Sequence, residues 1–111
     1  MKENKAKTHN EVLVELEIMS KEIVRHYGGK MNLVAVVGML ELLKDPDNRP
    51  SMVIDKPENM SEQLRYNLGG LLNAYLFVSE YEKLGVLTMI QMDITQGAFQ
   101  PQHNVDRTNA E

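Results

Sequence analysis

The stretch RYNLGGLLNAYLFVSEYEKLG, residues 65–85, decides the fold, because its apolar residues recur at helical spacing from end to end. Two adjacent glycines, Gly69 and Gly70, stand near its centre. Two glycines inside a helix cost about 2 kcal/mol relative to alanine. We therefore expect the glycines to serve a close contact with another helix, either in the same chain or in a second copy.

The limits of this helix follow from its flanking residues. Asn59, with Glu62 three residues later, is typical of a helix start, and Gly85 is typical of a helix end. The spacing predicts one long helix over residues 60–84, roughly 37 Å in length. Two adjacent apolar seams cover about half of its circumference, which is wide enough to contact two neighbours.

One seam of the predicted helix has features of a helix–helix interface. Gly70 and Ala74 are small residues four positions apart, a spacing that lets two helix backbones approach closely. Asn67 lies on the same seam, where a lone polar residue can fix register and partner number. We predict an oligomer or partner interface on this seam, comprising Asn67, Gly70, Ala74, Phe77 and Tyr81.

The opposite side of the helix is predicted to face outward, and Gly69 belongs to it. Gly69 permits a bend or the close approach of a ligand or partner. The residues around it are large enough to form a docking patch, unless the last helix or the C-terminal tail covers them. These residues are Tyr66, Leu72, Asn73 and Leu76.

Other capping signals define the remaining helices. Thr8 followed by Glu11 is a capping box, so a first helix starts there, and Gly28-Gly29 ends it. Asn32 is a typical N-cap for a second, largely buried helix that Asp45-Pro46 stops. Residues 51–54 read as a short extended segment. Residues 88–94 fit a strand or a short helix, and we favour the helix because no partner strand is visible.

These elements predict a mainly α fold, a small bundle of three to four helices. We expect a single helical domain over residues 8–95. Residues 1–7 are predicted to be a flexible N-terminal lead-in and residues 96–111 a flexible C-terminal tail, since both are polar and without periodicity.

Composition excludes several functional classes. The 111 residues contain no cysteine, which excludes disulfides, thiolate catalysis and cysteine-ligated zinc. The net charge of −4 argues against nucleic acid as the partner. The most apolar run, residues 33–43, is too short to span a membrane, and the N-terminus lacks the apolar run of a signal peptide. We therefore expect a cytoplasmic protein without a membrane segment.

The turn between the first two helices is the only candidate ligand site. Tyr27, Gly28, Gly29 and Lys30 offer glycine amides and a lysine ahead of a helix N-terminus, which are the ingredients of an anion site. The spacing of the phosphate-binding loop is absent, however, because Met31 follows the lysine instead of Ser or Thr. A plain helix-to-helix turn is the alternative.

Residues with catalytic or metal-binding chemistry are sparse. Glu22 and His26 lie one helical turn apart, and Glu41 is the only charge in its apolar helix, but the Glu-x-x-His pairs of a di-metal bundle are missing. A metal-dependent enzyme using these three residues is the reading we favour least. We predict no catalytic residue, no metal and no cofactor.

The sequence thus predicts a small non-enzymatic interaction or regulatory protein, of the adaptor or inhibitor type. It is expected to be a homo-oligomer, a homodimer through the 60–84 helix, and to bind another protein. The alternative is a small protein that binds an anionic ligand or nucleotide at a subunit junction through Tyr27 to Lys30.

Overall fold

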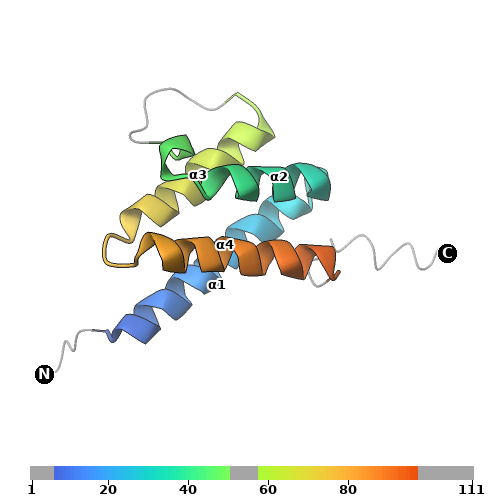
Figure 1. Cartoon of the computed structure of the whole chain (residues 1–111). Helices are drawn as coiled ribbons and strands as arrows, with labels where there is room; N and C mark the ends of the chain where they lie inside the picture. Colours follow the sequence, from blue (N-terminus) through green and yellow to red (C-terminus); the bar gives the residue numbers. More distant parts are fainter. Residues whose placement is uncertain (1–6, 51–57, 98–111) are drawn as a thin grey trace, which may run out of the picture.

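The computed structural model describes residues 7–50 and 58–97, and in this part of the chain it contains helices and no strand (Figure 1). Helix α1 packs mainly against α3, and α2 packs mainly against α4. The predicted mainly α bundle is confirmed. The elements in chain order are α1 (His9–Gly28), α2 (Leu33–Leu43), the short 3-10 helix η1 (Pro46–Asn48), α3 (Met60–Ala74) and α4 (Glu80–Thr95).

The predicted helix starts are confirmed by their capping hydrogen bonds. The Thr8 hydroxyl accepts from the Glu11 amide, and the Glu11 carboxylate accepts from the Thr8 amide, which completes the capping box of α1. Asn32 caps α2 by accepting from the Val34 amide. These bonds satisfy backbone donors that a helix N-terminus otherwise leaves without partners.

The single long helix over residues 60–84 is wrong, because α3 ends at Ala74 and α4 begins at Glu80. A second capping box causes the break. The Ser79 hydroxyl accepts from the Glu82 amide, and the Glu82 carboxylate accepts from the Ser79 amide and hydroxyl. This local hydrogen bonding starts a new helix and offers the backbone an alternative to continuing the old one.

The strand considered for residues 88–94 is also wrong, since these residues lie inside α4, as the favoured helical reading predicts. The extended segment expected at 51–54 lies outside the described residues.

All four helices contribute to one apolar core. Its fully buried leucines, valines and isoleucine exclude water from the centre of the bundle, and Ser20 is the polar residue buried among them. In residues 7–50 and 58–97, every helix is too short or too polar to cross a bilayer. The fully buried apolar residues are Leu16, Val24, Val36, Leu40, Leu43, Leu64, Leu68, Leu72, Leu87 and Ile90.

Candidate interaction surface

One side of α3 is covered by other parts of the chain, and Gly69 allows them to pack closely against the helix. A methyl group in place of the Gly69 hydrogen would lie 2.7 Å from the Pro50 Cδ atom and 3.2 Å from the Leu43 Cδ2 atom. The first distance is too short for any real contact, and the proline ring cannot rotate away. The close approach that the sequence led us to expect therefore occurs at Gly69, and its neighbours are the segment after η1 and Leu43 at the end of α2. Placing Gly69 on the outward side was wrong.

Polar contacts hold this segment against α3. The buried Arg49 side chain donates from Nε to the Leu43 carbonyl (2.9 Å) and pairs with the Glu80 carboxylate (2.9 Å). Asn73 donates from Nδ2 to the Pro50 carbonyl (2.8 Å), and Arg65 adds a bond to the Asn48 carbonyl. We call this side of α3 the closed side. Of the residues predicted around Gly69, Leu72 is buried, Tyr66 and Asn73 are partly buried and Leu76 is exposed. The cover at Gly69 itself comes from Arg49 and Pro50, whereas the sequence pointed to the last helix or the tail.

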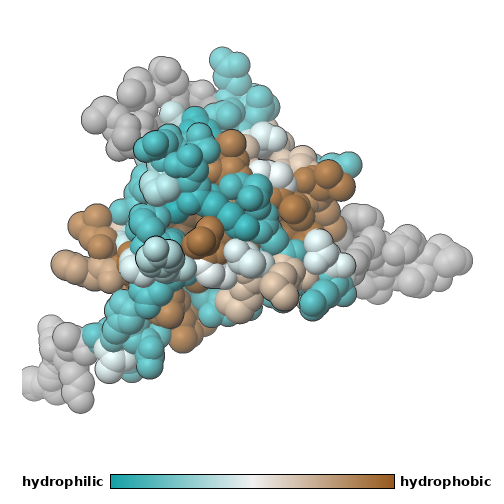
Figure 2. All heavy atoms as spheres, in the orientation of Figure 1, coloured by the Kyte–Doolittle hydropathy of each residue, from teal (hydrophilic) through white to brown (hydrophobic). Residues whose placement is uncertain are grey.

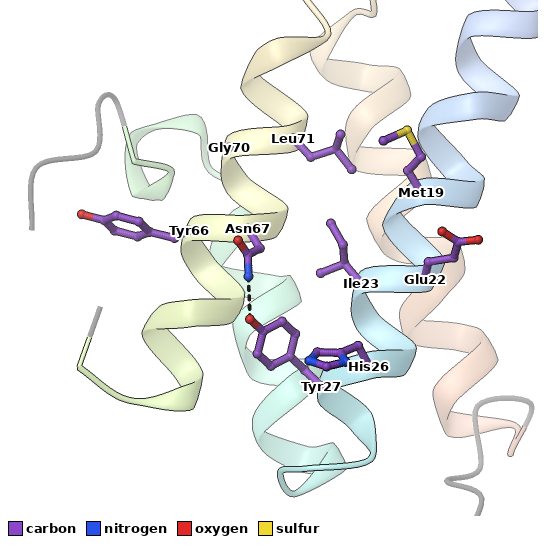
Figure 3. Close-up of a pocket in the computed structure, with 9 residues that line it drawn as sticks. All are labelled: Met19, Glu22, Ile23, His26, Tyr27, Tyr66, Asn67, Gly70 and Leu71. Atoms are coloured by element: carbon purple, nitrogen blue, oxygen red, sulfur yellow. Dashed lines mark hydrogen bonds between the residues drawn. The ribbon is translucent and has the colours of Figure 1, made fainter. Parts of the chain in front are cut away.

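The other side of α3 is open and forms a groove with α1 (Figure 3). Figure 3 shows Ile23 and Leu71 projecting toward each other from the two helices. A methyl group at Gly70 would have no atom of residues 7–50 or 58–97 within 4 Å, so none of the described helices crosses α3 at this glycine, contrary to the intrachain alternative. The groove has a volume of about 650 Å³ and is lined by Met19, Glu22, Ile23, His26, Tyr27, Tyr66, Asn67, Gly70 and Leu71.

A polar pair lies at one end of the groove. Asn67 donates from Nδ2 to the hydroxyl of Tyr27, as the dashed line in Figure 3 shows. The Tyr27 ring is buried, and the His26 ring packs edge-on against it. The predicted seam residue Asn67 is therefore engaged within its own chain, although its side chain remains on the surface.

Two further hollows continue this surface along α1. The second, also about 650 Å³, shares Met19 and Glu22 with the groove and holds the half-exposed Val14 and Ile18. The third, about 410 Å³, shares Lys7 with the second and reaches the connection between α3 and α4. The second hollow overlaps the groove at Met19 and Glu22, whereas the third meets the second only at Lys7. We call the surface lined by the three hollows the α1–α3 face.

The corner between α3 and α4 carries the most exposed apolar side chains. Leu76, Phe77 and Tyr81 are 79%, 89% and 87% exposed. Figure 2 shows apolar atoms projecting at the left edge, where Figure 1 places this connection. We call these three residues the corner patch. The break after α3 thus divides the predicted interface residues: Asn67 and Gly70 line the groove, whereas Phe77 and Tyr81 lie on the corner patch beside the exposed Ala74.

Hydrogen bonds and nearby charges stabilise the charged forms of Lys7 and Glu82 near this surface. A hydrogen bond from Lys7 to the Glu15 carboxylate (2.8 Å) raises the pKa of Lys7. Contacts with His9 (2.7 Å) and then the Ser79 amide lower the pKa of Glu82. Burial raises the pKa of Tyr75. Lys7 therefore remains a cation and Glu82 an anion at neutral pH.

The turn from Tyr27 to Lys30 has few donors left for an anion. The amides of Lys30 and Met31 both donate to the Tyr27 carbonyl, at 3.0 and 2.9 Å. Gly28 is buried beside Leu33, while Gly29 and Lys30 are exposed. Anion sites of this type depend on free backbone amides. Ligand binding at this turn stays a prediction, and the geometry gives it no added support.

The structure does not bring the three candidate metal ligands together. Glu22 and His26 line the groove, whereas Glu41 lies on α2 and pairs with Lys44 (3.0 Å). That lysine, followed by Gln91, lowers the pKa of Glu41. Among residues 7–50 and 58–97, no three His, Asp or Glu side chains are grouped as a metal site.

Comparison with known proteins identifies no relative: the chain matches no protein-family model, no curated protein and no solved structure.

Proposed function

We propose that this chain is a small non-enzymatic interaction protein, of the adaptor or inhibitor type, that self-associates and binds another protein. The observation that carries the proposal is the corner patch, where Leu76, Phe77 and Tyr81 are almost entirely exposed. Large apolar side chains gathered at one surface site are typical of protein–protein contacts. Aromatic residues in particular supply much of the binding energy in such contacts.

The local structure supports this role, because the corner is anchored to the fold at Val78 and Ser79. Val78 lies between the exposed residues and is buried in the core (3% exposed). The Ser79 capping box starts α4 immediately afterwards. A partner that binds the corner patch therefore has little chain entropy to overcome, which favours affinity.

Affinity capture with matched variants tests the proposal. The bait proteins are the wild-type chain, the corner variant Leu76→Ser/Phe77→Ser, and Val34→Ser as the control. Val34 on α2 is as exposed as Leu76, at 79%, but lies outside the α1–α3 face. We expect at least one protein to be captured by the wild-type and Val34→Ser baits and not by the corner variant.

Two observations complete this test. All three baits should have the same melting temperature, because the changed side chains lie on the surface. Equal capture of the same proteins by all three baits would contradict the proposal, since the corner patch would then contribute nothing to binding.

A further inference from the structure

The groove lies between two helix segments that run side by side in opposite directions. The Tyr75 hydroxyl of α3 donates to the Met19 sulfur of α1 at one end (3.3 Å), and Asn67 donates to Tyr27 at the other. These two contacts are about two turns, or 12 Å, apart on each helix. An α-helix of a partner can lie along a groove of this kind, with its residues i, i+3, i+4 and i+7 facing the floor.

The floor of the groove is apolar and has room for a large side chain. Ile23 and Leu71 project toward each other between the two helices (Figure 3). Gly70 precedes Leu71, and a methyl group there would meet no atom of the described residues within 4 Å. A leucine or phenylalanine of a bound helix can therefore enter beside Gly70 and contact this floor, and anchors of this type carry much of the energy of such complexes.

The charges beside the groove are mainly acidic. Glu22 lies where the groove meets the second hollow, and it makes no ion pair with any residue of 7–50 or 58–97. Glu11 and Glu15 continue the row along α1, and Lys7 pairs with Glu15 (2.8 Å). The α3 wall of the groove carries no charged side chain. One lysine therefore faces three carboxylates, which leaves this surface net acidic.

This acidic row favours a basic partner. Lysine or arginine side chains beside the apolar seam of a bound helix would pair with Glu22, whereas a second copy bound through the same row would bring like charges together. An extended partner is not favoured, because the described part of the chain has no strand whose edge it could join.

We infer that the groove binds an amphipathic α-helix of another protein, with an apolar seam that enters beside Gly70 and with lysine or arginine side chains that pair with Glu22. The inference rests on the proposed function, since it takes the chain to bind another protein, and it adds a binding site separate from the corner patch.

Selection from a phage-displayed library of random peptides tests the inference with a defined probe. The library is selected on the wild-type chain, and peptides that also bind Gly70→Leu are removed, because the leucine fills the space at this position. We expect the retained peptides to be net basic, to carry apolar residues at helical spacing and to become helical on binding, as measured by circular dichroism.

Charge reversal tests the acidic row with a variant that leaves the floor unchanged. Glu22→Lys should weaken the binding of the selected peptides about tenfold, measured by fluorescence anisotropy at low salt. Asp47→Lys is the matched control, because it makes the same change of charge on η1, away from the three hollows. It should change the affinity less than about twofold. Thermal unfolding of each variant verifies that it is folded.

Several results would overturn the inference. The selected peptides could be acidic or bind without forming a helix, or no peptide could prove sensitive to Gly70→Leu. Equal binding by the Glu22→Lys and Asp47→Lys variants would have the same meaning. A wild-type dimer that Gly70→Leu converts to monomer in light scattering would place a second copy in the groove instead.

The proposed function fails by a different result. Equal capture by the wild type and the corner variant overturns the role of the corner patch, whatever binds the groove. The selected peptides should bind the Leu76→Ser/Phe77→Ser variant as tightly as the wild type, because these residues do not line the groove.

Discussion

Gly69 and Gly70 are neighbours in the sequence, yet they serve opposite sides of α3. At Gly69 a methyl group would lie 2.7 Å from the Pro50 ring, whereas at Gly70 it would meet no atom within 4 Å. The first glycine allows the segment after η1 to pack closely against α3. The second leaves a gap that no described residue fills.

The two sides of α3 also differ in how they are held. The closed side is tied by a buried guanidinium, by Glu80 and by the Asn73 amide, so its geometry is specific. The open side is apolar and only partly covered, with Asn67 as its polar contact to α1. We therefore expect substitutions on the closed side to lower stability and those on the open side to change association instead.

The largest effect is expected from removal of the Glu80 carboxylate, which pairs with Arg49 on the closed side of α3. Glu80→Ala leaves the buried Arg49 without its counter-charge. Breaking such a pair costs several kcal/mol when both partners are buried, but Glu80 is 53% exposed. We therefore expect the free energy of unfolding to fall by about 2 kcal/mol, measured by urea denaturation.

A double variant identifies the cause of that loss. Arg49→Met/Glu80→Ala replaces the buried cation with an apolar side chain and should be more stable than Glu80→Ala alone. If the double variant were less stable than Glu80→Ala, Arg49 would stabilise the fold without Glu80, through its bond to the Leu43 carbonyl, and an uncompensated charge would not explain the loss.

The next effect comes from Gly69→Ala. The added methyl group forces Pro50 away from α3, and overpacking of this kind costs about 2 kcal/mol. The better helix propensity of alanine returns about 1 kcal/mol of that loss. Thermal unfolding should show a melting temperature lower by about 5 °C. An unchanged or higher value would mean that the segment after η1 yields without cost.

Gly70→Ala should change the stability in the opposite direction to Gly69→Ala, which makes the two variants a direct test of the comparison. The added methyl group meets no atom, so the propensity gain stands alone and should stabilise the monomer by up to about 1 kcal/mol. The measurement is the same thermal scan, run at a concentration where light scattering shows monomer. Destabilisation would mean that a neighbour fills the gap within the chain.

The smallest effect compares two asparagines of α3. Asn73→Ala removes a part-buried bond to the Pro50 carbonyl, and after the propensity gain we expect a loss of about 0.5 kcal/mol. Asn67→Ala also removes a part-buried bond, but the Asn67 side chain is itself exposed and Asn73 is not, so we expect a smaller loss or none. Equal losses in urea denaturation would remove the distinction between the two sides.

Local signals in the sequence were enough to place most helix ends. Thr8, Asn32 and Asn59 are caps with clear side-chain chemistry, and each starts a helix in the structure. The break after Ala74 was missed although Ser79 and Glu82 form a recognisable capping box. Apolar spacing continues across the break through Tyr75 and Val78, so the periodicity concealed it.

The roles of the two glycines could not be assigned from periodicity. A helical wheel separates apolar from polar positions, and it placed Gly69 outward because its neighbours are polar. The surface that covers Gly69 is an irregular segment, Arg49-Pro50, which has no periodic pattern to reveal it.

The exposure of Val14 and Ile18 was missed for a different reason. They lie off the buried stripe of α1, and that position was itself the signal of exposure.

The contact between Pro50 and Gly69 also has a consequence for folding kinetics. It joins two segments that are distant in the sequence, and it needs α3 already formed as a helix and the preceding chain returned across it. Isolated helices form within about 1 μs, so we expect this contact to form after α3, late in folding. A substitution at Gly69 should then accelerate unfolding and leave the refolding rate almost unchanged.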